Sequence, residues 1–229
     1  MNHVLLDVHS LVVEMNNKCL LDHVSFQVQA GSICALMGHN GAGKSTTLQS
    51  IMGLIKKKGG SISINHYTLE HDVFQYKQQF SYIPEEPMLL VEFTVFQYFQ
   101  FYASLYGINE TDFKSRVEYY TSLFDLTEKR NEYPENLSKG MRQKVNIIGA
   151  LIVETPLIII DEPFIGLDVK ASTFLEQELK RKVDQGATIV LTSHVVERIN
   201  RLCDQYIVLE KGKIIEQGDI DQFETYIGK

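Results

Sequence analysis

Hydrophobic residues follow two spacings along this chain, one typical of strands and one typical of helices. In "VSFQV" (24–28) they alternate with polar residues, which predicts a strand with one buried face. The segment "ICALM" (33–37) is apolar throughout, which predicts a strand covered on both faces. Later apolar segments predict further strands: 157–160, 187–192 and 205–210.

Segments with helical spacing separate these strands. Apolar residues recur at this spacing directly after Gly43: Leu48, Ile51, Met52 and Ile55. The pair Gly59–Gly60 then predicts a turn before a short strand at 61–64. Later helices are expected near 170–185 and 195–202. Strands that alternate with helices indicate an α/β fold with a mostly parallel sheet, and the alternating first strand adds an antiparallel β edge.

Aromatic residues distinguish the middle of the chain. From Thr94, a good N-cap residue, to Tyr106 they recur at helical spacing, and we expect most of this stripe in the core. A second helix is expected over about 111–126, and Pro134 closes the segment. We therefore predict a single domain, 1–229, made of a core with an inserted α-helical subdomain: 1–87 and 136–229 for the core, and 88–135 for the subdomain.

The composition allows a large core and argues against nucleic acid as a partner. Hydrophobic residues make up 44% of the 229 residues, and the formal net charge is −7. The basic run Lys56–Lys58 is typical of a solvated turn, so we expect no nucleic-acid partner. The cysteines are scattered without metal-ligand spacing, and we expect buried thiols in a reducing compartment: Cys19, Cys34 and Cys203.

The chain shows no targeting or membrane-spanning pattern. Its first residues, "MNHVLLDVHS", lack the charged start and long apolar core of a signal peptide. No apolar run approaches the ~18 residues that a membrane span requires. The chain is therefore expected to be cytoplasmic, and a membrane role would have to come from a partner.

The segment "GHNGAGKST" matches the phosphate-binding pattern G-x-x-x-x-G-K-[ST], which predicts a P-loop NTPase core. A predicted strand precedes it and a predicted helix follows, so backbone N–H groups can wrap around phosphates at the positive end of the helix. We expect Lys44 to reach β- and γ-phosphate oxygens and the Ser45 hydroxyl to bind Mg²⁺. The predicted phosphate-binding residues are Gly38, His39, Asn40, Gly41, Ala42, Gly43, Lys44, Ser45 and Thr46.

Two carboxylates follow the apolar segment 157–160, where side chains emerge at the carboxyl edge of a parallel sheet. Asp161 is expected to hold the metal through water, and Glu162 to polarise the attacking water as a general base. Taken alone, Asp-Glu-Pro would also serve as the start of a helix. The phosphate-binding loop upstream favours the catalytic interpretation.

Five motifs follow one another along the chain: "GHNGAGKST", "LSKGMRQ", "LIIIDEP", "GLD" and a histidine after the next strand. In this order they resemble the motifs of nucleotide-binding subunits of ATP-binding cassette (ABC) transporters, and the resemblance extends from Leu11 to Gly218. The resemblance implies an ATPase that uses ATP and Mg²⁺. It also implies that the signature run, Leu137–Gln143, opens a helix whose N-terminus faces the γ-phosphate bound by the opposite subunit, with Ser138 and the backbone near Gly140 as donors.

Other roles follow from the same resemblance. The segment Gly166–Asp168 resembles the loop that crosses the dimer interface, and His194 resembles the histidine that contacts the γ-phosphate. The position of His194 directly after the strand 187–192 favours this role over that of an ordinary surface histidine. Ser138 can also be an ordinary N-cap of its helix, and its two roles are compatible.

Two positions depart from the commoner pattern of the family. Glu85 stands where a glutamine usually contacts Mg²⁺ or the lytic water; a glutamate can do both, but it adds negative charge beside the triphosphate. Met15 stands where an aromatic ring usually stacks on adenine, and its thioether offers less stacking area. Glu85, together with "SKGM" in place of "SGGQ", is similar to ATPases of the ABC-2 type export branch.

The resemblance implies a subunit that powers a membrane transporter of the export branch. Two ATPase subunits, identical or different, would form a head-to-tail dimer that ATP closes and hydrolysis opens. The dimer would sit on separate transmembrane permease subunits, peripheral on the cytoplasmic face of the cell membrane. Phe93–Tyr106 and the loop of Glu85 are expected to receive a short coupling helix of the permease.

Other classes of ATPase compete with this interpretation. A soluble ABC ATPase with an assembly role, of the cluster-assembly type, would also be a short acidic single cassette. DNA-repair relatives insert long coiled coils and ribosome-bound relatives carry tandem cassettes with a basic linker, and this chain has neither. A P-loop kinase is disfavoured by the signature run and by His194.

Overall fold

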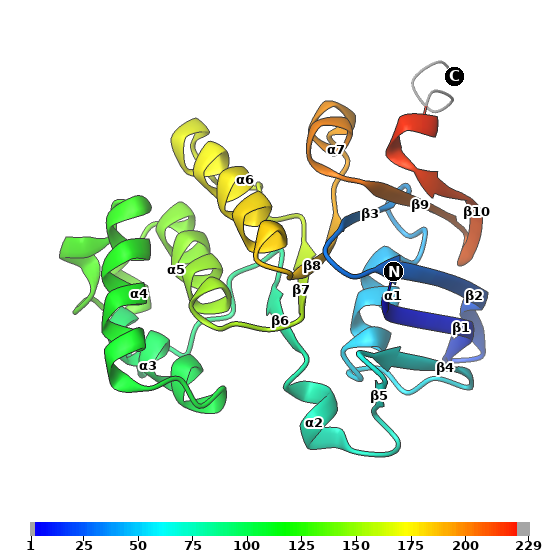
Figure 1. Cartoon of the computed structure of the whole chain (residues 1–229), viewed down its shortest axis with the longest axis horizontal. Helices are drawn as coiled ribbons and strands as arrows, with labels where there is room; N and C mark the ends of the chain where they lie inside the picture. The colour runs from blue at the N-terminus through cyan, green and yellow to red at the C-terminus, as the bar shows by residue number, and fades with distance from the viewer. Residues whose placement is uncertain (1–2, 224–229) are drawn as a thin grey trace.

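The computed structural model describes residues 3–223, which form two sheets and a group of helices (Figure 1). The smaller sheet is antiparallel, in the order β2-β1-β4-β5. Its strands are β1 (Val4–Met15), β2 (Lys18–Gln29), β4 (Gly59–Ile64) and β5 (Tyr67–Thr68). The larger sheet has the order β10-β9-β3-β8-β7-β6 and is parallel except at β10. Its strands are β3 (Ile33–Met37), β6 (Phe80–Ile83), β7 (Leu157–Asp161), β8 (Thr188–Thr192), β9 (Gln205–Glu210) and β10 (Lys213–Asp219).

The helices flank the larger sheet and extend beyond it to one end of the molecule (Figure 1). They are α1 (Lys44–Ile51), α2 (Val73–Lys77), α3 (Val95–Leu105), α4 (Glu110–Leu123), α5 (Lys139–Ile152), α6 (Val169–Asp184) and α7 (Val196–Leu202). Short 3₁₀ turns occupy Thr127–Lys129, Pro134–Asn136 and Ile220–Gln222. Within residues 3–223, no helix has both the length and the apolar character needed to cross a bilayer.

Side-chain alternation along the strands divides the interior into two cores, one on each face of the larger sheet. On β3, Ile33 and Ala35 point to the face covered by α3 to α7. Cys34 and Leu36 point to the opposite face, which α1 and the smaller sheet cover. All residues of β3, β7 and β8 are buried, which explains why these strands are apolar runs in the sequence.

The helices α3, α4 and α5 pack together at the end of the molecule away from the smaller sheet (Figure 1). Thr94 starts α3 with a capping box, in which its Oγ1 accepts from the Gln97 N–H and Gln97 Oε1 accepts from the Thr94 N–H. Further along α3, the Tyr98 ring lies against Gly149 of α5. A Cβ at Gly149 would be 2.9 Å from Tyr98 Cε1, so glycine allows the close approach of these two helices.

The predicted α/β class is confirmed, and the structure adds elements that the hydrophobic pattern did not reveal: β1, β5, β6, α2 and β10. The pairing of β1 with β2 contains several register shifts, which interrupt the alternation on which a strand prediction depends. The strand expected at 24–28 is the second half of β2, and it lies in the smaller sheet. The larger sheet has its antiparallel edge at β10 instead.

One side chain expected in the core is exposed. The prediction was wrong for Cys19, which is exposed near the tip of the β1–β2 hairpin, whereas Cys34 and Cys203 are buried. A cysteine fits a core by residue type, but its place near the hairpin tip leaves this one at the surface.

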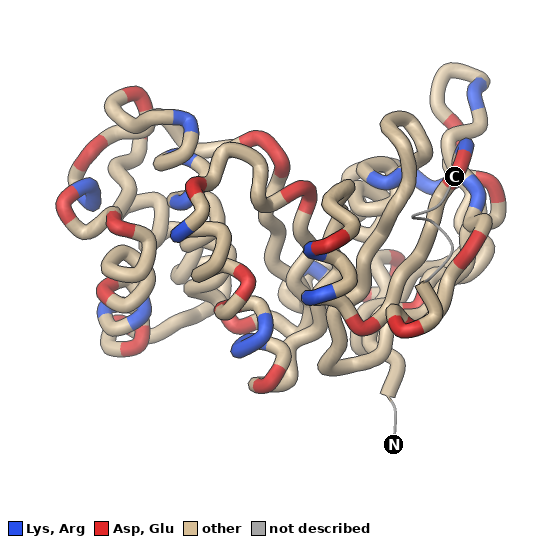
Figure 2. Tube along the Cα trace, turned by 90° about the horizontal axis from the view of Figure 1, so that it is seen from above, with Lys and Arg blue, Asp and Glu red and all other residues tan. Residues whose placement is uncertain are grey.

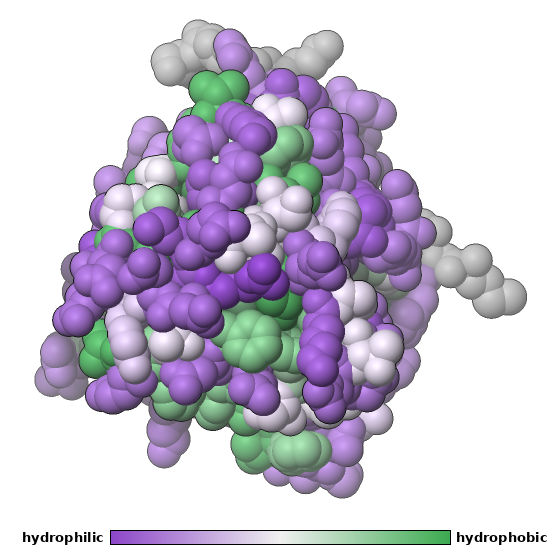
Figure 3. Space-filling view, turned by 90° about the vertical axis from the view of Figure 1, so that its left-hand side faces the viewer, coloured by the Kyte–Doolittle hydropathy of each residue, from purple (hydrophilic) through white to green (hydrophobic). Residues whose placement is uncertain are grey.

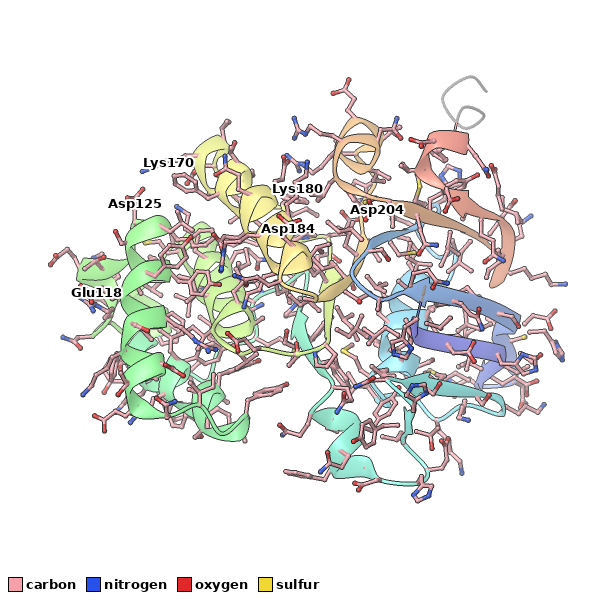
Figure 4. All side chains as sticks on the ribbon, in the orientation of Figure 1. Glu118, Asp125, Lys170, Lys180, Asp184 and Asp204 are labelled. Atoms are coloured by element: carbon pink, nitrogen blue, oxygen red, sulfur yellow. The ribbon has the colours of Figure 1, made fainter. Side chains whose placement is uncertain are left out.

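Charged residues are spread along the whole trace, with Lys and Arg interspersed among Asp and Glu (Figure 2). Some form ion pairs between elements: Lys170 Nζ on α6 lies 2.7 Å from Asp125 Oδ2, just beyond α4 (Figure 4). Both side chains are exposed, so this pair contributes about 0–1 kcal/mol.

Lys182, in the last turn of α6, is a buried cation with little compensation. Its side chain is nearly inaccessible to solvent, and within residues 3–223 its Nζ donates only to the Val153 carbonyl, at 3.5 Å. Burial lowers the pKa of Lys182 from 10.5 to about 8. Between these two pH values the unfolded chain binds a proton that the folded chain does not. Lys182 therefore makes folding more favourable as the pH rises through this window.

We expect the substitution Lys182→Met to remove this pH dependence. The free energy of unfolding of the wild type should rise relative to that of the variant between neutral pH and a pH midway between the two pKa values. Urea unfolding at both pH values measures the difference. Lys180→Met, at an exposed position of the same helix (Figure 4), is the matched control. A difference that stays constant for Lys182→Met would contradict the assignment of Lys182 as a buried charge.

Candidate active site

Four of the predicted site segments lie where the parallel strands of the larger sheet end. The neighbouring strands β3, β8 and β7 run in the same direction, so their carboxyl ends lie at one edge. The phosphate-binding loop follows β3, the two carboxylates end β7, and His194 follows β8. Glu85 follows β6, the next strand along. Chain segments far apart in sequence are thereby brought to one place.

Two glycines of the P-loop occupy positions that no other residue would fit. Gly38 has φ +141°, and a Cβ there would lie 2.3 Å from the Leu209 carbonyl oxygen. Gly43 has φ +114°, and a Cβ there would lie 2.8 Å from Leu21 Cδ2 of β2. Gly43 is also the N-cap of α1, and no side chain caps this helix end. The loop is therefore shaped by glycine and leads directly to the positive end of a helix.

Lys44 lies over the P-loop. Its side chain is largely buried, and Nζ donates to the Gly38 carbonyl at 2.6 Å and to the His39 carbonyl at 3.3 Å. Ser45 is exposed and Thr46 is half-buried. Among the other loop residues, His39, Asn40 and Gly41 are exposed and Ala42 is buried. The loop thus presents an ammonium group and a hydroxyl group next to each other.

Asp161 and Glu162 are both 7% exposed. Asp161 Oδ1 accepts a hydrogen bond of 2.6 Å from the Thr192 hydroxyl of β8. Glu162 leaves the strand with φ +45°, a left-handed conformation that costs a non-glycine residue about 1–3 kcal/mol. Strained conformations of this kind persist where the surrounding structure holds them, and they cluster at functional sites.

Glu162 lies among the other charged residues of the site. Its Oε1 lies 2.6 Å from His194 Nδ1, although no donor is aligned with this buried oxygen for a hydrogen bond. Burial raises the pKa of Glu162; the positive charges of His194 and Lys44 lower it, and the negative charges of Asp161 and Glu85 raise it. Four predicted site residues therefore lie close enough to influence this carboxyl group.

Glu85 is an exposed carboxylate beside the buried ones. Its charge also acts on Tyr82 of β6: burial, followed by the charges of Asp161 and Glu85, raises the pKa of Tyr82 to about 12. The next residue, Glu86, pairs with Lys139 of the signature run, with 2.7 Å between Oε1 and Nζ. The loop after β6 thus adjoins both the carboxylates and the start of α5.

The signature run starts α5 but does not join the P-loop of its own chain. Ser138 is the N-cap, and its Oγ accepts from the Met141 N–H at 3.2 Å, as expected for a capping residue. A Cβ on Gly140 would lie 2.8 Å from the Gly166 carbonyl oxygen, so this helix packs closely on the segment before α6. Within residues 3–223, no hydrogen bond or ion pair connects Ser138 or Gly140 to 38–46.

Sequence reasoning missed two partners of the motif residues. Lys144 Nζ lies 2.8 Å from Asp168 Oδ2, while Asp168 Oδ1 accepts from the Ala171 N–H and caps α6. This contact with Lys144, followed by the capping hydrogen bond, lowers the pKa of Asp168. The other missed residue is Thr192, which binds Asp161. The sequence did contain a signal for Thr192, because it is a polar residue at the end of a buried strand next to the strand that carries the carboxylates.

Met15 is 47% exposed near the tip of the β1–β2 hairpin, where it pairs with Lys18. The same hairpin contacts the P-loop through Leu21, which lies against Gly43. The hairpin therefore places Met15 on an element that borders the P-loop. Its contact with adenine stays a prediction.

The oxygen-bearing side chains of the site suit a Mg²⁺ ion that is bound together with phosphate. Within residues 3–223, no group of three or more His, Cys, Asp or Glu side chains could hold a metal ion by itself. Mg²⁺ usually takes only one or two carboxylates and completes its shell with water and substrate phosphates. The residues expected to bind the metal offer oxygen atoms of this kind: Ser45, Asp161 and Glu85.

A glycine-shaped loop at a helix start, a lysine above it, and carboxylates at the adjacent strand ends define a P-loop nucleotide hydrolase. Comparison with known proteins places the chain within this class. The sequence profile described as "ABC transporter" matches residues 21–165. The chain belongs to this family, and it is an ATP-binding, ATP-hydrolysing subunit of a transporter.

Individual relatives cover nearly the whole chain. The ABC-type transporter ATP-binding protein EcsA of Bacillus subtilis is 35% identical over 98% of this chain and 91% of its own length. The SkfA peptide export ATP-binding protein SkfE of the same organism is 34% identical over 96% of this chain and 91% of its own. A solved ATP-binding subunit of an ABC transporter superposes with a TM-score of 0.92 and 39% identity, covering 95% of this chain and 90% of the other.

Proposed function

We propose that this ATPase subunit powers a membrane exporter as one half of a head-to-tail dimer. One observation supports this proposal most directly. The buried carboxyl group of Glu162 lies within reach of the charges of four other predicted site residues: Lys44, Asp161, His194 and Glu85. This arrangement suits nucleotide hydrolysis. The direction of transport is supported by relatives that are named for export, among them SkfE and a Nod factor export protein of Ralstonia nicotianae, which is 28% identical.

The P-loop binds the phosphates of ATP. Its N–H groups and the N-terminus of α1 attract the negative oxygens, and Lys44 exchanges its carbonyl contacts for the β- and γ-phosphates. Mg²⁺ would be held by Ser45, Asp161 and Glu85, and would neutralise charge on the phosphate oxygens. Met15 would pack against the adenine ring.

Glu162 acts as the general base toward the attacking water. Burial raises the pKa of Glu162, which makes its carboxylate a better proton acceptor, whereas the nearby charges of His194 and Lys44 act in the opposite direction. His194 also contacts the γ-phosphate from the end of β8. Its side chain is 60% exposed, so its ring is accessible to a ligand at this edge.

The signature run of one subunit completes the nucleotide site of the other. The N-terminus of α5 and the Ser138 hydroxyl are exposed and have no bond to their own P-loop within the described chain. A helix N-terminus of this kind binds phosphate oxygens. Gly166–Asp168 lies against the same helix and would cross to the partner subunit. ATP then joins two chains, and hydrolysis releases them.

The permease docks beside the loop of Glu85, at the membrane face. The space-filling view of the helical end shows hydrophobic side chains that interrupt a mostly hydrophilic surface (Figure 3). The exposed apolar residues of this region follow Glu85 or lie on α3: Met88, Leu90, Val91, Phe101 and Leu105. Exposed apolar side chains of this kind suit a short coupling helix of a transmembrane subunit. The chain would then be peripheral on the cytoplasmic face.

We expect Glu162→Gln to abolish multiple turnover while ATP binding is kept, because the amide preserves the size of the side chain but cannot accept the proton. Phosphate release and nucleotide affinity are measured on the same sample. Glu118→Gln, on the exposed surface of α4 (Figure 4), should turn over normally. Hydrolysis by Glu162→Gln near the wild-type rate would remove Glu162 from the role of base.

The shared site predicts how two defects combine in a homodimer. Lys44→Ala removes the ammonium that reaches the phosphates, and Ser138→Arg blocks the signature run with bulk. If each site joins Lys44 of one subunit to Ser138 of the other, placing the two changes on different subunits leaves one site intact. Placing both changes on one subunit damages both sites.

The measurement is the amount of ATP trapped per purified dimer, whose two subunits carry different tags. Both subunits also carry Glu162→Gln, so the comparison between a shared site and a site within one chain does not require turnover. We expect more trapped nucleotide in the dimer with the changes on different subunits. More nucleotide in the dimer with both changes on one subunit would show that each site is built within a single chain.

We expect polytopic membrane subunits to co-purify with the chain from detergent-solubilised membranes, and Val91→Asp to remove them because a charge cannot enter the apolar contact. Ile215→Asp, at an exposed apolar position of β10, is the matched control and should keep the complex. ATP binding by both variants verifies that they fold. Recovery of soluble partners alone would support an assembly role instead.

A further inference from the structure

Thr192 is the last residue of β8, and its side chain is fully buried. It pairs with Asp161, the last residue of the neighbouring parallel strand β7. The segment that carries His194 starts directly after it. Thr192 therefore stands at the junction between the strand that supplies the carboxylates and the strand that supplies the histidine.

The hydroxyl of Thr192 makes two hydrogen bonds whose directions are fixed by chemistry. Its Oγ1 accepts from the backbone N–H of Glu162 at 2.9 Å, because an amide nitrogen can only donate. Its own O–H is then free to donate to Asp161 Oδ1, at 2.6 Å, because an ionised carboxylate can only accept. One buried hydroxyl thus holds the backbone of one carboxylate residue and the side chain of the other.

Each bond constrains a different part of the site. Asp161 Oδ1 is occupied by Thr192, which fixes the plane of the carboxyl group and leaves the second oxygen for other ligands. The N–H of Glu162 belongs to a residue with φ +45°, where the chain has left the strand and the regular ladder of the sheet ends. Without Thr192 this buried N–H would lack its acceptor, and the strained turn would lose the contact that holds it.

We propose that Thr192 is a positioning residue for ATP hydrolysis: its hydroxyl orients Asp161 toward the metal and fixes the backbone turn that directs Glu162 toward the attacking water. The inference rests on the proposed roles of Asp161 and Glu162. Thr192 does not touch the reacting atoms. It acts as the partners of metal ligands generally do, by fixing the orientation of the groups that bind.

Thr192→Val tests this assignment, because valine keeps the shape of threonine and removes both hydrogen bonds. We expect kcat to fall about 10- to 100-fold, as for the loss of other residues that orient metal ligands, with little change in the affinity for ATP in the absence of hydrolysis. The Mg²⁺ concentration for half-maximal activity should rise several-fold. Thr192→Ser restores the hydroxyl, and should stay within about threefold of the wild type in both quantities.

Thr188→Val controls for the loss of a buried hydrogen bond as such. Thr188 lies at the other end of β8, is also fully buried, and its Oγ1 accepts from the Gly31 N–H at 3.0 Å. This variant should lose thermal stability much as Thr192→Val does, but keep kcat and the Mg²⁺ requirement. Comparison of melting temperatures for the three variants verifies that each is folded at the assay temperature.

Two results would overturn the inference. One is a Thr192→Val enzyme with the kcat and Mg²⁺ requirement of Thr188→Val; the other is equal loss in Thr192→Val and Thr192→Ser. Failure of the proposed function looks different. If Glu162→Gln remains active, Glu162 is not the base, yet a raised Mg²⁺ requirement in Thr192→Val would still support the positioning of Asp161.

Discussion

Parallel pairing of fully buried strands is the constraint on which the rest of this structure depends. In β3, β7 and β8 both faces are covered, so polar side chains have no place along these strands and appear only where the strands end. Because the strands run in the same direction and in register, their ends meet: Leu36 is paired with Thr192, and Thr192 with Asp161. The candidate active site lies at this edge for that reason.

Burying several carboxyl groups at one edge of a sheet costs free energy unless other groups compensate for their charge. Burial and the charges of Asp161 and Glu85 oppose ionisation of Glu162, whereas His194 and Lys44 favour it. The balance depends on residues from four separate segments of the chain. It also depends on a backbone turn at Glu162 that a regular strand would not provide. Geometry and charge at this site are therefore set together.

The helix α5 connects the parts of the molecule that the proposed mechanism requires to communicate. At one side, Lys139 pairs with Glu86 and Gln143 Nε2 donates to the Pro84 carbonyl, which ties α5 to the loop after β6. At the other side, Lys144 pairs with Asp168 before α6. A rigid element thus links the loop proposed to receive the permease with the segment proposed to face the partner subunit.

The sequence by itself determined the α/β class, the position of the main strands and the identity of the phosphate-binding loop. These follow from local signals: continuous apolar runs, helical spacing, and glycines at Gly38 and Gly43, whose backbone angles exclude other residues. The capping role of Ser138 was also local, because an N-cap depends on the next three residues alone.

Only the tertiary structure decided which side chains meet. The contacts of Thr192 with Asp161 and of Lys144 with Asp168 join residues on different elements, and no spacing along the chain encodes them. The separate antiparallel sheet depended on register shifts that interrupt the hydrophobic alternation of β1. The exposure of Cys19 depended on its place near a hairpin tip. Pairing between strands fixes the contact of Thr192 with Asp161, the smaller sheet and the hairpin, because the partner of each strand residue is set by the strand beside it and not by its neighbours in sequence. Packing of α5 against the segment before α6 fixes the contact of Lys144 with Asp168.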